Sequence, residues 1–277
     1  EMLRSDKNMP QLSLSEGNTI FYDYTPPSTE EGVTFVFYNA LTGDAGMWLS
    51  EIAPALQQAG HGTLVWNFRG QANSSFTPGL ALDDLLIVAD AGRLLLELKP
   101  PRCVLVGLSI GGLFAARTYL AGWPAAGMVL INTLRRPGPR LAWLNDAALR
   151  CAEVGGLELI KDLFGALIFN EEWLAQNRVN AFKDTPYTPL TPEHGHYRLL
   201  SDCRSADWDV PYEQLDLPVL VLTGLQDDMF LNPVDVATYA ARLPQAQRLD
   251  LADAGHMVPV EQPQAFIQAL LDFTRSL

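Results

Sequence analysis

The chain has 277 residues, of which 48% are hydrophobic and 18% charged, and its net charge at pH 7 is −13. These proportions are typical of a globular protein with a sizeable core. The negative charge disfavours nucleic acid or an anionic membrane as a partner, because both require a cationic face. The 3 cysteines are too few for a disulfide framework or a zinc knuckle.

No apolar run approaches the length of a transmembrane helix. Residues 1–7 also lack the apolar centre of a signal peptide. We therefore expect a cytoplasmic protein. The sequence leaves the oligomeric state open.

Apolar and polar residues alternate on both sides of residues 16–18, which predicts a β-hairpin. Strands and helices then alternate as far as residue 132. The expected strands are 33–38, 62–67, 103–106 and 127–132, and the expected helices are 47–59, 82–98 and 113–120. This order predicts a mostly parallel sheet with helices on both faces.

The alternation stops between residues 133 and 215, where the pattern is helical and interrupted by prolines. Helices are expected at 141–152, 157–169, 171–182 and 194–204. The alternation resumes with strands at 217–224 and 247–251 and helices at 234–243 and from 262. We predict a core made of residues 1–133 and 216–277, with residues 134–215 as a helical lid over the carboxyl ends of the strands, where open α/β sheets bind ligands.

A G-x-S-x-G pentapeptide, Gly107 to Gly111, lies between a buried strand and a helix. Side chains two positions either side of Ser109 would collide in a tight turn, and glycine at both positions removes them. The turn then exposes the Ser109 hydroxyl at the start of a helix. The alternative is a glycine-rich turn without chemical consequence.

A serine hydroxyl needs an adjacent base, which a third group must hold in place. Of the 4 histidines, only His256 is expected at the same sheet edge as Ser109, because it follows the last strand. Asp227 and Asp228 follow the preceding strand and emerge at that edge too. The chain order is therefore serine, acid, histidine.

The most specific segments are Gly107-Leu-Ser-Ile-Gly-Gly112 and Ala254-Gly-His-Met-Val-Pro-Val-Glu-Gln-Pro263. With this chain order they resemble the α/β-hydrolase-fold superfamily, from Val33 to the C-terminal helix. The similar members are lid-bearing esterases, haloperoxidase-like perhydrolases, carbon–carbon bond hydrolases and lactonases. The resemblance implies a triad of Ser109, Asp227 and His256. The family's G-x-x-D pattern selects Asp227, with Asp228 as the alternative.

Acyl transfer also requires N–H donors for a developing oxyanion. One is the backbone N–H of Ile110, and the resemblance implies Leu41 as the second. The usual His-Gly before that donor is replaced by Asn39-Ala40. A second departure places Asn67 and Ala72 where the family has aspartate and glycine.

Some lid aromatic residues are expected to line the pocket, and the candidates are Trp143, Phe164, Phe169 and Trp173. His194 and His196 are spaced for a metal, but no third ligand is evident. We therefore expect neither a metal nor a cofactor.

The leading hypothesis is a serine hydrolase of a small, largely apolar ester, thioester or lactone. A carbon–carbon bond hydrolase, an acyltransferase or a cofactor-free oxygenase could use the same triad. A haloalkane dehalogenase is disfavoured, because that chemistry places an aspartate at position 109. From another class, the altered Asn39-Ala40 loop keeps a slow-turnover ligand-binding signalling protein as an alternative.

Overall fold

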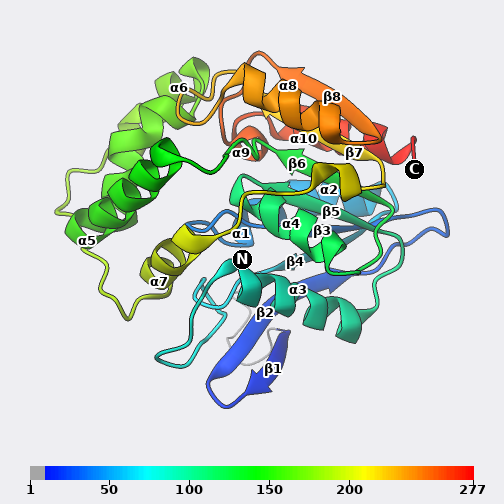
Figure 1. The fold of residues 1–277 in the computed structure, drawn as a ribbon, viewed down its shortest axis with the longest axis horizontal. Coiled ribbons are helices and arrows are strands. Elements are labelled where there is room, and N and C mark those ends of the chain that lie inside the picture. The colour runs from blue at the N-terminus through cyan, green and yellow to red at the C-terminus, as the bar shows by residue number, and fades with distance from the viewer. Residues whose placement is uncertain (1–9) are drawn as a thin grey trace.

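The computed structural model describes residues 10–277, so residues 1–7, judged above for a signal peptide, lie outside the described part. One sheet of 8 strands runs through the molecule in the order β1-β2-β4-β3-β5-β6-β7-β8 (Figure 1). The strands are β1 (Gln11–Ser15), β2 (Asn18–Thr25), β3 (Thr34–Tyr38), β4 (Gly62–Trp66), β5 (Cys103–Leu108), β6 (Gly127–Ile131), β7 (Val219–Gly224) and β8 (Ala246–Leu251).

The α-helices lie mostly between these strands. They are α1 (Gly46–Leu49), α2 (Ile52–Gln58), α3 (Asp84–Leu98), α4 (Ile110–Leu120), α5 (Pro139–Ile168), α6 (Glu171–Ala181), α7 (Gly195–Asp202), α8 (Pro233–Arg242), α9 (Val258–Glu261) and α10 (Pro263–Thr274). In residues 10–277, none combines the length and apolar character needed to span a bilayer.

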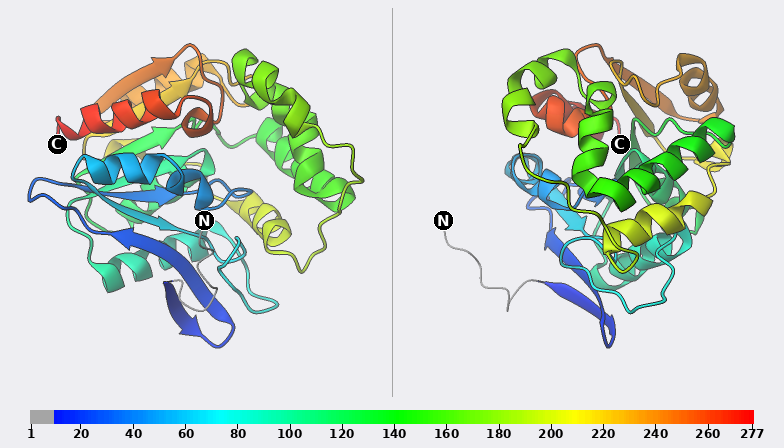
Figure 2. Two further views of the ribbon diagram at one scale, coloured as in Figure 1. Left: turned by 180° about the vertical axis from the view of Figure 1, so that it is seen from behind. Right: turned by 90° about the vertical axis from the view of Figure 1, so that its left-hand side faces the viewer.

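The sheet is antiparallel only where β2 pairs with β1 and β4, and its other pairs are parallel. Alternate residues of each strand face opposite layers. On β3, Val36 packs in the layer with α3, α4 and α8, whereas Phe37 packs in the layer with α2 and α10 (Figure 2). Because helices cover both faces, the central strands are apolar along their whole length. The predicted α/β fold, with its hairpin and mostly parallel sheet, is confirmed.

Parallel pairing brings the carboxyl ends of β3, β5, β6, β7 and β8 to one edge of the sheet. The chain passes from β3 to β4 on one side of β3, and later returns as β5 on the other side. The loops that leave β3 and β5 therefore diverge, which opens a crevice at this edge.

The segment between β6 and β7 contains α5, α6 and α7, which extend beyond the carboxyl edge of the sheet (Figures 1 and 2). The two helices predicted at 141–152 and 157–169 are both present, and they meet at a kink at Gly156 inside the element α5. Gly156 has a φ of 68°, and a Cβ there would lie 2.2 Å from the Thr188 carbonyl oxygen. The close approach of that loop holds the kink.

One helix prediction was wrong in detail. The helix predicted at 47–59 is interrupted at Ser50 and Glu51 and forms α1 and α2. The helix predicted from residue 262 is α10, which begins at Pro263 with Gln262 as its N-cap, and the short α9 precedes it. Pro263 at the first position of α10 removes a backbone N–H donor, which favours a helix start there.

Candidate active site

Ser109 lies in a backbone turn that most residues avoid. It connects β5 to α4 with a φ of 57° and a ψ of −121°, and it is 2% exposed. Such a conformation costs about 1–3 kcal/mol and persists only where the surroundings enforce it. Here the Ser109 N–H donates to the Ile131 carbonyl at 2.7 Å, and the Thr133 hydroxyl donates to the Ser109 carbonyl at 2.8 Å.

The two glycines of the pentapeptide make this turn possible. A Cβ on Gly107 would lie 2.3 Å from the carbonyl carbon of Gly111. A Cβ on Gly111 would lie 2.3 Å from the carbonyl oxygen of Tyr38. Both approaches are to backbone atoms, which cannot move aside as a flexible side chain can. The collision expected from the sequence is therefore found at Gly107, whereas glycine at position 111 is required by the close approach of the end of β3.

Asp227 and His256 are joined directly. Asp227 Oδ2 lies 2.5 Å from His256 Nδ1, and both residues are buried. Asp227 lies in the loop after β7 and His256 in the loop after β8. A hydrogen bond at Nδ1 leaves Nε2 as the ring nitrogen available to a third group.

Three further donors surround the Asp227 carboxylate. Oδ2 also accepts from Asn132 Nδ2 at 3.0 Å, and Oδ1 accepts from the backbone N–H groups of Met229 at 3.1 Å and Phe230 at 2.9 Å. Burial alone would raise the pKa of Asp227, but His256, Asn132 and the Phe230 N–H hold that pKa below its ordinary value. Asp228 is exposed. The geometry therefore favours Asp227 over Asp228 as the partner of the histidine.

Glu261, in α9, organises the backbone around His256. Its Oε1 accepts from Gly255 N at 3.0 Å and from Asn170 N at 2.5 Å, and its Oε2 accepts from Met257 N at 2.9 Å. Burial raises the pKa of Glu261 against the opposing effect of these three donors. One carboxylate thus fixes both neighbours of His256 and ties them to the α5–α6 connection.

The loop after β3 is held by a buried network of amides. Gln71 Nε2 donates to the carbonyl oxygens of Ala40 at 2.9 Å and Leu41 at 3.1 Å, and Gln71 Oε1 accepts from Asn39 Nδ2 at 3.0 Å. Asn39 Oδ1 accepts from Trp48 Nε1 at 2.7 Å. Asn39 thus supports the loop from behind, where it is 1% exposed.

Leu41 and Ile110, the two predicted oxyanion donors, line the same cavity as Ser109. Within residues 10–277, neither the Leu41 nor the Ile110 backbone N–H donates to another protein group. Ala40 does not have a positive φ, so this loop follows a path that alanine tolerates. Ala72, which replaces the family's glycine, does take a positive φ, of 35°.

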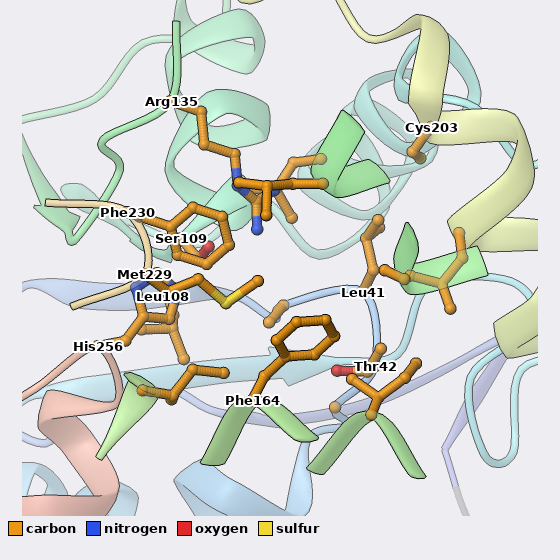
Figure 3. A pocket seen from close by; sticks show the side chains of 18 of the residues that line it. Leu41, Thr42, Leu108, Ser109, Arg135, Phe164, Cys203, Met229, Phe230 and His256 are labelled. Carbon is orange, nitrogen blue, oxygen red and sulfur yellow. The ribbon is translucent and has the colours of Figure 1, made fainter. Parts of the chain in front are cut away.

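The cavity has a volume of about 260 Å³ and contains Ser109 and His256 in its lining (Figure 3). That volume is slightly below the range of about 300–1,000 Å³ typical of ligand pockets, so it suits a small molecule. Most of the other lining groups are apolar, among them Leu41, Phe164 and Met229. Phe230 packs against His256, with ring centroids 4.8 Å apart.

Of the four lid aromatics suggested by the sequence, Phe164 lines the cavity and the other three do not. Trp143 is 79% exposed. Phe169 and Trp173 stack on each other, with centroids 3.7 Å apart. Helical spacing indicates which residues are apolar but does not determine which face of a long helix meets the pocket, and this is why the sequence could not single out Phe164 among the four candidates.

The structure also places in the cavity a residue that the sequence reasoning missed. Arg135 lines it from the segment that follows β6, with its guanidinium carbon 4.4 Å from the Phe230 ring centroid. The sequence contained a signal for this position. Arg135 lies four residues after Ile131, the last residue of a buried parallel strand, so it follows the edge of the sheet where the crevice opens.

His194 and His196 stack with ring centroids 5.6 Å apart at the start of α7. His194 accepts from the His196 backbone N–H at 3.2 Å, as a helix cap does. Within residues 10–277, no three Asp, Glu, Cys or His side chains are grouped so that they could hold a metal ion.

Comparison with known proteins agrees with this architecture. The model of the alpha/beta hydrolase family matches residues 35–269. A protein described as a candidate carbamate hydrolase, RutD, from Variovorax paradoxus is 26% identical over 92% of this chain and 95% of its own. The 3-oxoadipate enol-lactonase 1 of Acinetobacter baylyi is 25% identical over 95% of each chain.

Among solved structures, the enol-lactonase of Burkholderia xenovorans superposes with a TM-score of 0.76 at 23% identity, covering 95% of this chain and 99% of its own. The fold is therefore shared with that enzyme. Since the family model matches most of the sequence, the chain belongs to the alpha/beta hydrolase family. The family and the names of its relatives support a hydrolytic enzyme.

Proposed function

We propose that the chain is a serine hydrolase of small carboxylic esters, thioesters or lactones. Ser109 is the nucleophile, His256 the general base and acid, and Asp227 the group that orients the imidazole. The 2.5 Å contact between Asp227 and His256, in the same site as a serine on a strained turn, carries this proposal. Acyl transfer through a serine needs a nucleophile, a base and an orienting acid at one site.

In the first half of the reaction, Ser109 Oγ attacks the substrate carbonyl carbon and its proton passes to His256 Nε2. The carbonyl oxygen becomes an oxyanion, to which the N–H groups of Leu41 and Ile110 donate. The tetrahedral intermediate then expels the alcohol or thiol, which takes the proton from His256. With a lactone, the new alcohol stays attached to the acyl chain.

In the second half, water attacks the acyl-enzyme and gives its proton to His256. The second tetrahedral intermediate collapses, Ser109 recovers the proton, and the carboxylic acid leaves. Throughout, the ionised Asp227 stabilises the imidazolium that forms twice per turnover. The lowered pKa of Asp227 supports this role, because the carboxylate stays charged at neutral pH.

We further propose that residues 134–215 act as a lid on the cavity. Phe164 and Ile160 of α5 and Leu200 of α7 contribute apolar groups to its lining. A substrate with a small apolar acyl or ring portion suits such a lining. The lactonase among the relatives makes lactones the first class to assay.

The amide network behind Ala40 and Leu41 also bears on the binding-protein alternative. That alternative rested on an altered loop after β3, and Gln71 holds the loop backbone at two carbonyl groups. A loop fixed in this way supports a preorganised donor site and thus favours turnover over slow ligand retention.

The test is intact-protein mass spectrometry after exposure to a fluorophosphonate probe, together with assays on a panel of esters, thioesters and lactones. Ser109→Ala is the variant. Ser28→Ala is the matched control, because Ser28 is exposed and precedes β3, at the opposite edge of the sheet. We expect one adduct on the wild type and on Ser28→Ala, with neither adduct nor turnover in Ser109→Ala.

Persistent turnover in Ser109→Ala would overturn the assignment of the nucleophile. A labelled wild type that hydrolyses no member of the panel would instead direct attention to acyl transfer or carbon–carbon bond cleavage. Absence of both labelling and turnover in the wild type would contradict the proposed function.

A further inference from the structure

Arg135 reaches into the cavity beside Phe230 and Ser109 (Figure 3). Its Nε atom is buried and has no hydrogen-bond partner. Within residues 10–277, no other nitrogen of this side chain forms a hydrogen bond or ion pair either. A cationic group therefore lines the catalytic cavity without a protein anion attached to it.

Arg69 provides a comparison within the same molecule. It is 6% exposed, and its Nε and Nη2 donate to the two carboxylate oxygens of Asp90 at 2.8 and 2.9 Å. This bidentate pairing is the usual way in which a confined guanidinium is satisfied. Arg135 lacks a corresponding partner, and a cation confined without an anion is unfavourable for the folded protein.

Asp227 is not available as the anionic partner of Arg135. Its two carboxylate oxygens already accept from His256, Asn132 and the backbone N–H groups of Met229 and Phe230. No ion pair joins it to Arg135 in the described structure. The Asp227 charge acts on Arg135 only at longer range.

Two aromatic rings hold the guanidinium in place. Its central carbon lies 4.4 Å from the Phe230 ring centroid and 5.4 Å from the Trp208 ring centroid. Such contacts stabilise a cation through the faces of the rings and leave its N–H groups free to donate. Burial lowers the pKa of Arg135 to about 10, and the Asp227 charge opposes the decrease, so the group is cationic at neutral pH.

The charges nearby are compatible with an anionic ligand. Arg204, also in the cavity lining, is paired with Asp146 at 3.0 Å. An adjoining cavity shares Arg135 and Phe230 with the first, and its lining also contains Arg140, Asp228 and the pair of Arg136 and Asp235, 3.3 Å apart. Among the described residues, Arg135 is thus the arginine of the catalytic cavity that has no carboxylate partner, while the Asp44 carboxylate in the same lining accepts from the Gly46 N–H at 2.7 Å.

We propose that Arg135 binds a carboxylate of the substrate, so that the preferred substrates are small esters or lactones carrying a free carboxylate. This inference rests on the serine hydrolase function proposed above. A planar carboxylate can accept two N–H groups of the guanidinium. Because Phe230 lies between Arg135 and His256, the carboxylate binds close to the reacting carbonyl, and a cavity of about 260 Å³ limits the molecule's size.

The test compares methyl hydrogen glutarate with dimethyl glutarate, which differ only in the free carboxylate. We expect the wild type to have a kcat/KM for methyl hydrogen glutarate, the half ester, that is roughly 10–150-fold higher than for the diester. This is the ratio that one charge-assisted hydrogen bond supplies. Arg135→Met removes this preference and retains hydrolysis of the diester, whereas Arg135→Lys keeps part of it. Arg150→Met, on the exposed side of α5, is the matched control and keeps the full preference.

An equal decrease on both substrates in Arg135→Met would overturn the proposal, because it would indicate a structural or oxyanion-stabilising role. An unchanged preference in that variant would overturn it too. Calorimetric titration of both esters into Ser109→Ala, with and without Arg135→Met, measures the site without turnover.

If the half ester binds through Arg135 while fluorophosphonate does not label Ser109, the carboxylate site stands and the serine hydrolase function fails. If Ser109 is labelled but neither turnover nor binding distinguishes the two esters, the carboxylate site fails alone.

Discussion

The Asn132 side chain connects the end of β6 to the acid loop after β7: its Nδ2 donates to Asp227 Oδ2 at 3.0 Å, and its Oδ1 accepts from Gly224 N at 2.7 Å. Asn132 has a φ of 46°, a left-handed conformation that asparagine adopts more readily than most residues. Asn132 thus both adopts the left-handed backbone conformation and donates a hydrogen bond that keeps Asp227 ionised.

Asn132→Asp preserves the shape of this side chain but replaces the donor with a negative charge. We expect the pKa of Asp227 to rise and kcat/KM to fall by roughly 10–150-fold, the range for a hydrogen bond to a charged group. A pH profile of kcat/KM should show the loss of activity on acidification beginning at a higher pH. Asn180→Asp, exposed on α6, is the control, and a profile that does not differ from it would contradict the role of Asn132.

Asp227→Asn tests the acid more directly. Loss of the charge leaves the imidazolium without its partner, so we expect kcat to fall by roughly 10³–10⁴-fold. Asp228→Asn, at the exposed neighbouring position, should retain near wild-type turnover. The reverse ranking of these two variants would assign the role to Asp228.

The same carboxylate should affect acid stability. The pKa of Asp227 is lower in the folded protein than its ordinary value, so its stabilisation is present above about pH 4 and disappears as the pH falls through the folded-state pKa. Urea unfolding between pH 3 and 7 should therefore show a smaller acid-dependent decrease in Asp227→Asn than in the wild type. Parallel curves would contradict this linkage.

Glu261→Gln tests how the histidine loop is held. The amide retains an oxygen for Asn170 and Gly255 but turns an N–H group toward the Met257 N–H, and a buried unsatisfied donor costs about 1–3 kcal/mol. We expect a lower free energy of unfolding and a reduced kcat with little change in KM. Gln264→Glu, an exposed polar exchange on α10, is the comparison.

Gly107→Ala tests the steric basis of the serine turn. A Cβ at this position meets the Gly111 backbone at 2.3 Å, so we expect loss of fluorophosphonate labelling of Ser109 together with reduced stability. Gly165→Ala in α5 is the control, because a Cβ there meets nothing within 4 Å. That variant should keep its labelling and be stabilised by about 0.5–1 kcal/mol.

Local sequence determined much of this protein. The uninterrupted apolar runs identified strands buried on both faces, and the G-x-S-x-G pattern identified the turn that presents Ser109, because each signal lies within a few neighbouring residues. The steric need for glycine at position 111 is a tertiary one, since a Cβ there would meet the Tyr38 carbonyl oxygen. The order of the strands also placed His256 and an aspartate at the edge of the sheet that carries Ser109.

Other features depend on contacts between distant segments. The contact with His256 distinguishes Asp227 from Asp228 across 29 positions of sequence. The rotation of α5 turned Phe164 toward the cavity and left Trp143 exposed, and the kink at Gly156 follows from the approach of Thr188.

Arg135 illustrates the difference most clearly. In the sequence its place shortly after a buried strand is a signal that it shares with Arg136, in a segment rich in prolines. Only the packing of Phe230 and Trp208 around it, and the absence of a protein carboxylate beside it within residues 10–277, make it a candidate binding group. Burial and pairing of a charge are properties of the assembled interior, because they depend on which distant groups come within a few ångströms.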